Sequence, residues 1–374
     1  MTSIVGQKEI QARLARQLHE NAVPHALLFC GPEGSGKLAV ALRFAQALLC
    51  KNPNEGQPCG QCQGCKMAGD FVHPDLHFVF PVIKQKGQSG DAVSDMYLKE
   101  WREVLRTSAY VDYQDWLERM LVQNQQAQIA VAESDQILRK LSLTSQQGGY
   151  KVMIIWLPEL MNVQAANKLL KILEEPPKQT VFILVSNNSD KLLTTILSRT
   201  QRVAFKPLSK EDVSSALIQQ CGLQEADARR IAHQSAGNFT RALKQIRVDA
   251  DNGDFFERFV QLMRMCYQRD IKGIKNWSEE IADWGRERQK DFLDYVLYLV
   301  RENFMYNFQI PELNFMSQKE SDFSVRFARF INERNVVEIM EAVEEARRDV
   351  GQNVNPKMIF FDFGLRMIVL IIRC

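Results

Sequence analysis

Hydrophobic residues follow two different patterns in the two halves of the chain. In the first 206 residues, short and nearly continuous apolar runs alternate with segments of helical apolar spacing. Such runs are typical of strands that are buried on both faces of a parallel sheet. Four of them are bounded by polar or turn residues: HALLFC (25–30), DLHFVFPV (75–82), KVMIIWL (151–157) and TVFILVS (180–186). The alternation predicts an α/β domain with a parallel sheet and helices on both of its faces.

The segments between these runs have the spacing of amphipathic helices. Residues 129–143 and 161–177 repeat apolar side chains every three or four positions, and Pro176 and Pro177 end the second segment. The stretch at 84–95 is instead polar and rich in Gly and Ser. It predicts a mobile surface insertion.

The strand pattern ends near residue 207. Residues 207–248 contain short helical segments separated by Ser, Asp or Gly, which predicts a small helical lid domain. Residues 249–374 are helical in pattern almost throughout. One predicted helix face carries Phe292, Leu293, Val296, Leu297 and Val300. The sequence thus predicts three domains: an α/β domain (1–206), the lid (207–248) and an all-α domain (249–374).

Composition narrows the functional classes. The chain has 374 residues, of which 45% are hydrophobic and 25% charged, and its formal net charge is +2. A charge this close to zero predicts no strong electrostatic steering to nucleic acid or to an anionic membrane. The first 20 residues lack the apolar run of a secretory signal, and no stretch of 18 apolar residues occurs. We therefore expect a cytoplasmic protein without a membrane partner.

A glycine-rich loop follows the first predicted strand. GPEGSGKL (31–38) fits the phosphate-binding pattern G-x-x-x-x-G-K-[ST] except at its last position, Leu38. In such a loop, backbone N–H groups close around phosphates at the positive end of the following helix. The alternative is an ordinary Gly-rich turn between a strand and a helix. The candidate phosphate-binding residues are Gly31, Gly34, Ser35, Gly36, Lys37 and Leu38.

Two groups that hold magnesium in such sites are missing. The loop hydroxyl is replaced by Leu38, and the acidic pair expected after a neighbouring strand is replaced by Trp156 and Leu157. Glu159 lies three residues beyond the expected Asp, and its simplest interpretation is a solvated residue at a helix start after Pro158. We therefore expect ATP or ADP to bind, if at all, without turnover. The alternative is a self-sufficient ATPase that uses Glu159 at an atypical metal site.

Four of the eight cysteines form a cluster. Cys50, Cys59, Cys62 and Cys65 have the spacing C-x8-C-x2-C-x2-C, with glycines that permit tight turns. Four thiolates at this spacing are typical of a closed structural zinc site. An iron–sulfur cluster and unliganded thiols are the alternatives. A zinc-dependent DNA-binding module is disfavoured, because CGQCQGCKMAG has one lysine and no aromatic residue for base stacking.

The last predicted strand leads into a second polar site. Ser186, Asn187 and Asn188 lie where that strand ends, at the carboxyl edge of the sheet, where α/β folds bind ligands. Arg199 follows a short apolar helix. Taken alone, Arg199 is interpreted as an ordinary surface arginine.

Together these segments resemble a known family. The matching stretches are IVGQ (4–7), HALLFCGPEGSGK (25–37), the four-cysteine insertion, HPDL (73–76), AANKLLKILEEPP (165–177) and TTILSRTQ (194–201). They resemble the AAA+ ATPases of clamp loaders, and among these the delta-prime family of bacterial DNA polymerase III. The specific motifs cover about residues 1–245. The resemblance implies an AAA+ domain, a lid and an all-α collar-type domain for oligomerisation.

The resemblance also implies partners and roles. It implies a hetero-pentameric ring with ATP-hydrolysing clamp-loader subunits and a delta subunit, which places a sliding clamp on primed DNA. This chain would be a non-hydrolysing stator, not catalytic alone, within the DNA polymerase III holoenzyme. Arg199 would be an arginine finger acting in trans, although the family's Ser-Arg-Cys motif reads Ser198-Arg199-Thr200 here. Asn187 would lie near the first sensor position, and a second sensor is expected near Thr240 or Arg241.

Overall fold

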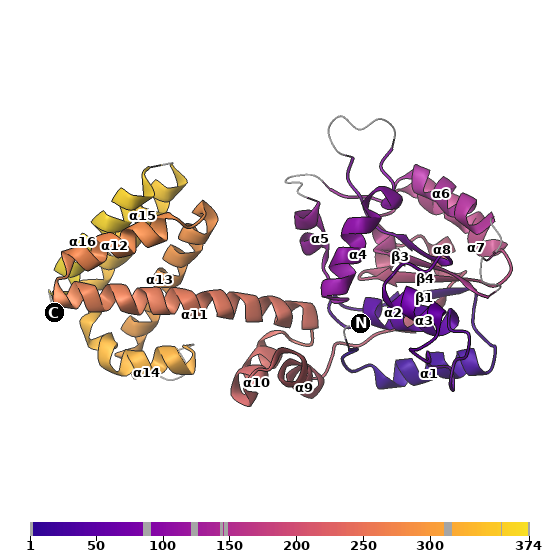
Figure 1. Cartoon of the computed structure of the whole chain (residues 1–374), viewed down its shortest axis with the longest axis horizontal. Coiled ribbons are helices and arrows are strands. Elements are labelled where there is room, and N and C mark those ends of the chain that lie inside the picture. Colours follow the sequence, from indigo (N-terminus) through magenta and orange to yellow (C-terminus); the bar gives the residue numbers. More distant parts are fainter. Residues whose placement is uncertain are drawn as a thin grey trace. The chain divides into compact units, whose positions relative to one another are not determined.

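The chain divides into two compact units, Met1–Gln245 and Ile246–Cys374. The structure is a computed structural model that describes residues 3–84, 91–120, 126–142, 145, 149–309, 316–352 and 354–372. Figure 1 shows a sheet with surrounding helices in the first unit and helices alone in the described part of the second. The three predicted domain boundaries remain a prediction.

The first unit is built on a parallel sheet. The described residues form five strands in the order β2-β3-β4-β1-β5, and all neighbouring pairs are parallel. The strands are β1 (Ala26–Cys30), β2 (Leu76–Val79), β3 (Lys151–Trp156), β4 (Thr180–Ser186) and β5 (Gln201–Ala204). The predicted fold class and all four predicted strands are confirmed. The edge strand β5 was not predicted, because Val203 is its only buried residue.

Helices cover both faces of this sheet. Figure 1 shows α6 and α7 on one side and α2 on the other. Their bounds are α2 (Lys37–Leu48), α6 (Val131–Ser142) and α7 (Val163–Glu174). Outside them, α1 (Lys8–His19) and α3 (Gln63–Gly69) pack against α2, and α8 (Thr194–Leu197) packs against α7. Because strand side chains alternate between faces, Leu28, Met153 and Phe182 share one core with Ile137 of α6 and Leu169 of α7.

A helical segment connects β2 to β3. It contains the 3₁₀ turn η1 (Ser94–Tyr97), α4 (Leu98–Thr107) and α5 (Tyr113–Arg119). Its two tryptophans, Trp101 and Trp116, are fully buried, and Trp101 stacks on Phe80 with ring centroids 4.5 Å apart. These helices were not predicted.

The predicted surface insertion at 84–95 is wrong for its second half. Residues 85–90 lie outside the described residues, whereas Ala92, Val93 and Ser94 are buried. The Ser94 N–H donates to Glu133 over 2.7 Å, and its hydroxyl donates to the Phe80 carbonyl over 3.1 Å. These bonds anchor a polar sequence inside the unit.

Two short helices and the start of a long one form the region predicted as a lid. They are α9 (Lys210–Cys221), α10 (Glu225–Gln234) and α11 (Phe239–Gln268). The side chain of Ser209 caps α9, and Gly222 ends it with φ at 68°. The turn before α11 contacts the segment just before α9, where the Leu208 N–H donates to the Gly237 carbonyl over 3.1 Å.

All regular elements among the described residues of the second unit are helices. After α11 it contains α12 (Ile271–Ala282), α13 (Arg286–Tyr306), α14 (Gln318–Phe327), η5 (Ala328–Phe330), α15 (Val336–Gly351) and α16 (Pro356–Ile372). The predicted face of α13 is confirmed: Phe292, Leu293, Val296 and Val300 are fully buried, and Leu297 packs partly buried against the same core. Within the described residues, no helix is long and apolar enough to cross a bilayer.

Candidate functional site

The glycine-rich loop joins β1 to α2, as the phosphate-binding pattern predicts. Lys37 is the first residue of α2, and its side chain is buried. Its ammonium group donates to the carbonyls of Gly31, over 2.8 Å, and Pro32, and lies 3.4 Å from the Ser35 hydroxyl. Burial lowers the pKa of Lys37 to about 8, although the carboxylates of Glu159 and Glu33 oppose this shift. The group that would meet a phosphate is thus bonded to its own loop.

The start of α11 closes over this loop. The Phe239 N–H donates to the Gly34 carbonyl over 3.1 Å. A Cβ on Gly34 would lie 1.8 Å from the Asn238 side-chain oxygen, so only glycine permits this approach. The Phe239 ring packs edge-on against Tyr110, with centroids 4.7 Å apart. Tyr110 in turn accepts a hydrogen bond from the Val5 N–H over 2.8 Å.

Ion pairs hold the same contact. Lys244 of α11 pairs with Asp112 and Asp115 at the start of α5, at 2.5 and 2.9 Å. Glu33 of the loop lies near these carboxylates: burial raises its pKa, and Asp112 adds to the shift. The loop therefore carries an acidic side chain close to the ion pairs between α11 and the start of α5.

The two positions that should hold magnesium are apolar and buried. Leu38 is 5% exposed and Trp156 is 3% exposed. The Trp156 ring packs against Trp101 with centroids 5.0 Å apart. Neither side chain has an oxygen atom, so neither can be a ligand of a hard cation.

The interpretation of Glu159 as a solvated residue is wrong. Leu157 takes the left-handed conformation, with φ at 55°, and leads into the 3₁₀ turn η2 (Pro158–Leu160). This irregular backbone turns Glu159 toward the end of β4, where its Oε1 accepts the N–H groups of Asn187, over 2.8 Å, and Asn188, over 3.2 Å. Its Oε2 is buried and has no hydrogen-bond partner among the described residues.

The polar end of β4 is therefore an ordered turn. Ser186 is fully buried, and its hydroxyl accepts the Asn188 N–H over 3.1 Å. Asn187 is half-buried beside it, with its backbone held by Glu159. The turn η3 (Ser189–Lys191) follows, and the Asn188 side chain caps it.

Arg199 lies after α8 at the edge of an open hollow. Its Nη1 donates to the Thr195 carbonyl over 2.9 Å and to the Ser198 hydroxyl over 3.3 Å. Its Nη2 forms an ion pair with Glu174, the last residue of α7. The hollow has a volume of about 430 Å³. It is lined by Pro24, His25, Ala26, Leu173, Glu174, Ser198, Arg199, Thr200 and Gln201.

The region expected to carry a second sensor has two different environments. Thr240 is 3% exposed, and its hydroxyl is buried with no hydrogen-bond partner among the described residues. Arg241 is exposed, and its N–H donates to the Asn238 side chain over 2.9 Å. The second sensor stays a prediction.

The four clustered cysteines converge as their spacing predicts. Their sulfur atoms all lie within 4.8 Å of one another, with Cys59–Cys65 at 3.8 Å and Cys50–Cys62 at 3.9 Å. These distances are too long for disulfides, whose S–S length is about 2.05 Å. A tetrahedral ion with Zn–S bonds of about 2.3 Å requires sulfur atoms about 3.8 Å apart. The donor set therefore fits a tetrahedral metal.

Backbone N–H groups also point at these sulfurs. The Cys59 N–H donates to Cys50, that of Cys62 to Cys59, and that of Cys65 to Cys62, over 3.3 to 3.4 Å. Although burial raises it, the N–H groups of Cys65 and Lys51 lower the pKa of the Cys62 thiol to about 6. Burial raises the pKa of the Cys65 thiol.

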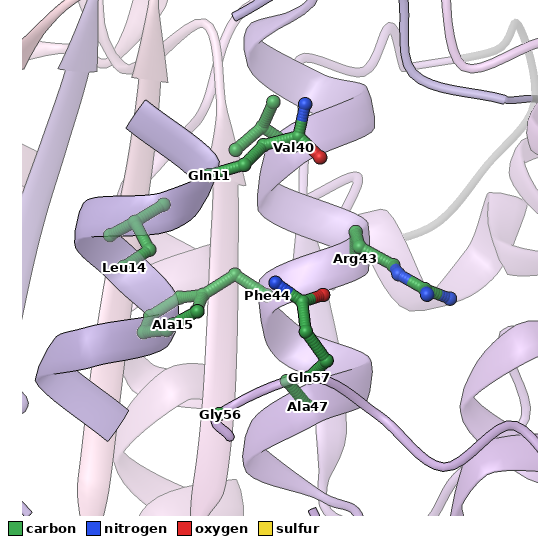
Figure 2. Close-up of a pocket in the computed structure, with 9 residues that line it drawn as sticks. All are labelled: Gln11, Leu14, Ala15, Val40, Arg43, Phe44, Ala47, Gly56 and Gln57. Atoms are coloured by element: carbon green, nitrogen blue, oxygen red, sulfur yellow. The ribbon is translucent and has the colours of Figure 1, made fainter. Parts of the chain in front are cut away.

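The cysteine segment is anchored on the first two helices. Figure 2 shows Gln57 and Gly56 beside Leu14 and Ala15 of α1 and Phe44 of α2, around a small hollow. A Cβ on Gly56, whose φ is 76°, would lie 1.8 Å from the Ala15 carbonyl oxygen. The hollow, of about 20 Å³, has room for about one water molecule and none for a nucleotide.

Comparison with known proteins places the chain in a family. Residues 6–209, more than half of the chain, match the family described as DNA polymerase III, delta subunit. The chain belongs to this family.

Its relatives carry related descriptions. The DNA polymerase III subunit delta' of Bacillus subtilis is 26% identical over 355 residues, covering 93% of this chain and 92% of that protein. The subunit delta' of Pseudomonas aeruginosa is 34% identical over 175 residues, covering 47% and 41% of the two chains. The subunit tau of Bacillus subtilis is 23% identical over 379 residues, and the match covers 96% of this chain but only 59% of that relative.

Solved structures give weaker matches. A gamma subunit-related protein of DNA polymerase III from Thermotoga maritima has 14% identity and a TM-score of 0.35, with 96% and 99% of the two chains covered. The DNA clamp loader delta protein of Bacillus subtilis has 12% identity and a TM-score of 0.32, with 81% and 98% covered.

The sequence motifs do not identify two residues of this site, and they identify a third, Glu159, without its contact. Tyr110 and Lys244 were not singled out, because isolated residues far from the loop in sequence give no motif. The interaction of Glu159 with the β4 turn was missed because it depends on one left-handed residue, Leu157. The one available signal was an acidic residue, Glu159, after a strand that lacks the expected acidic pair. From the sequence alone, Glu159 was interpreted as solvated.

Proposed function

We propose that this chain is a delta-prime-like subunit of a DNA polymerase III clamp loader, which does not hydrolyse ATP but supplies Arg199 in trans to a neighbour's ATP site. Family membership and the match with subunits named delta' support the first part. The single observation that carries the absence of hydrolysis is that Leu38 and Trp156 are buried where two magnesium ligands belong.

Loss of the metal ligands acts on the reaction directly. In P-loop NTPases a magnesium ion, when held by such ligands, would help neutralise the charge that develops on the phosphates. A loop with Lys37 alone can hold a nucleotide, yet it lacks the magnesium ion that would be the second cation beside the phosphates. The bonds from Lys37 to Gly31 and Pro32, with the contact between Phe239 and Gly34, add a cost to nucleotide entry because they must break first.

The finger role rests on the setting of Arg199. Its side chain is one-third exposed at an open hollow, so a group from another subunit can reach it. A guanidinium group placed beside a transferring phosphoryl group is worth about 10³ to 10⁵ in rate in related NTPases. The partners in this proposal are ATP-hydrolysing subunits related to tau and gamma, a delta subunit, the sliding clamp and, through the complex, primed DNA.

We also propose that Cys50, Cys59, Cys62 and Cys65 hold a structural zinc ion. Four thiolates leave no open coordination position, so the ion would crosslink its segment and supply no reactive water. One zinc per chain is expected by elemental analysis. Cys65→Ser should reduce this to about zero, whereas Cys221→Ser, at an exposed and isolated thiol, should leave it unchanged. Zinc-free protein with intact thiols would contradict the proposal.

A second candidate function is a self-sufficient ATPase. The buried and unpartnered Oε2 of Glu159 favours it, because a free carboxylate oxygen near Lys37 is a possible cation ligand. The same carboxylate, however, already accepts two backbone N–H groups, which gives it a structural role without any metal.

One experiment separates these functions. The purified chain is assayed for magnesium-dependent ATPase beside Lys37→Ala, and is then mixed with ATP-hydrolysing loader subunits, delta, clamp and primed DNA. We expect no ATPase above the Lys37→Ala control for the chain alone, and co-assembly with stimulated ATPase for the mixture. Robust turnover by the isolated chain, or failure to co-assemble, would contradict the proposed function.

A further inference from the structure

Arg199 is not free in this structure. One terminal nitrogen of its guanidinium group donates to Thr195 and Ser198 of its own segment, and the other pairs with Glu174. Glu174 ends α7 and Arg199 lies just after α8, so the pair links the end of α7 to the segment after α8 at the hollow that both residues line. A side chain that is to bind a phosphate of another subunit is thus held by its own chain.

The position of Glu174 is not explained by helix stability. Glu174 is the last residue of α7, and Glu175 follows it. A carboxylate at a helix C-terminus is unfavourable, because the last carbonyls already carry partial negative charge. Arg199 supplies the compensating positive charge for Glu174. Among the described residues, Glu175 has no ion pair, which makes it a matched control.

The pair is weak enough to be exchanged. The side chains of Glu174 and Arg199 are 47% and 33% exposed, so water screens their attraction. Exposed pairs of this kind shift an equilibrium by at most about five-fold. A terminal phosphate offers more negative charge than one carboxylate and accepts two parallel guanidinium bonds. The phosphate also repels the Glu174 carboxylate, so the two anions compete for one guanidinium group.

We propose that Glu174 is a positioning residue that holds Arg199 against its own subunit until the terminal phosphate of a neighbour's ATP displaces the carboxylate. This inference rests on the proposed role of Arg199 in trans. While the carboxylate holds Arg199, the finger is bound away from the neighbouring site, so Glu174 lowers kcat/KM for ATP at that site. It does not touch the reacting atoms.

The test is made in the reconstituted complex. Glu174→Gln removes the charge and keeps the size of the side chain, so kcat/KM for ATP should rise by up to about five-fold. Glu175→Gln, one residue further along, should leave kcat/KM at the wild-type value. The double variant Glu174→Gln, Arg199→Ala should behave as Arg199→Ala alone, because no finger remains to be released. Glu174→Ala repeats the measurement with a second side chain.

Each outcome decides the matter. A kcat/KM for both Glu174 variants equal to wild type, or lowered toward that of Arg199→Ala, overturns the inference, since Glu174 would then be irrelevant or would orient the finger productively. An increase that persists in the Arg199→Ala background also overturns it. If Arg199→Ala itself leaves the ATPase of the complex unchanged, the proposed finger fails first, and that result is distinct from a failure of Glu174 alone.

Discussion

Lys37 and Arg199, two cationic side chains of the first unit, have opposite environments. Lys37 is 4% exposed, and its ammonium group is bonded to the carbonyls of its own loop. Arg199 is one-third exposed at an open hollow, with a single carboxylate as its counter-ion. A buried cation bonded to its own backbone is costly to redirect, whereas an exposed one in a weak pair can bind a group from outside. The difference supports the proposal that Arg199, and not Lys37, acts on a group from another subunit.

The largest effect is expected from the exposed side. Arg199→Ala in the reconstituted complex should lower hydrolysis at the facing ATP site by about 10³-fold or more, because the charge on the transferring phosphoryl group loses its partner. Steady-state ATPase and complex assembly are measured together. Arg139→Ala, at another exposed arginine, is the control and should leave both unchanged. Equal ATPase for wild type and Arg199→Ala would show that Arg199 does not act on the ATP site of a neighbour.

The burial of Lys37 should be visible in the pH dependence of the free energy of unfolding. The pKa of Lys37 is about 8 in the folded chain and 10.5 in the reference state, so folding releases its proton between these values. The contribution of Lys37 to the free energy of unfolding is therefore lowest below pH 8, and rises as pH increases to 10.5, by up to about 1.4 kcal/mol per pH unit.

Urea denaturation of wild type and Lys37→Met across this range measures that contribution. The wild-type curve should rise relative to the variant, whereas Arg199→Ala should run parallel to wild type, since a guanidinium group keeps its charge. Parallel curves for wild type and Lys37→Met would show that Lys37 is not enclosed.

A smaller effect is expected at Glu159. This residue is structural in the proposed function and a metal ligand in the alternative, the self-sufficient ATPase. Glu159→Ala removes the acceptor of the Asn187 and Asn188 N–H groups, which should lower the free energy of unfolding by about 1.5 to 3 kcal/mol. Glu159→Gln keeps an oxygen acceptor and should cost less. Chemical denaturation measures both, with Glu175→Ala as an exposed control. If the isolated chain shows an ATPase that Glu159→Gln abolishes, the enclosed loop is an active site.

The smallest effect concerns the contact that closes the loop. Lys244→Met removes the pairs with Asp112 and Asp115, and should lower the free energy of unfolding by about 1 kcal/mol or less, because Lys244 is partly exposed. Hydrogen exchange at the Phe239 amide should become faster as its bond to Gly34 opens more often. Lys210→Met, at an exposed position of α9, should change neither quantity. Unchanged exchange at Phe239 would show that the ion pairs do not hold the loop closed.

Local patterns predicted the interior strands and failed at the edge. β1, β3 and β4 are buried at every position because both faces of the sheet are covered, so their sequences are nearly continuous apolar runs. β5 buries only Val203, so its sequence has no apolar run to detect. The prediction of a surface insertion failed at Ser94 for the opposite reason. Ser94 is polar, yet it is buried because Glu133 and Phe80 satisfy its hydrogen bonds. Apolar runs report burial on two faces, not membership of the fold.

The sequence by itself determined that the expected magnesium ligands are missing and that four clustered thiols are available to a metal ion. No fold can supply a side-chain oxygen ligand at Leu38 or Trp156, and four thiols within 16 residues are confined to a short segment. Only the tertiary structure decided which groups meet across long separations: Phe239 with Gly34, Glu159 with Asn187, and Glu174 with Arg199. Chemical identity is fixed residue by residue, whereas such contacts depend on how distant segments pack, and one left-handed residue, Leu157, redirects a carboxylate from solvent into the site.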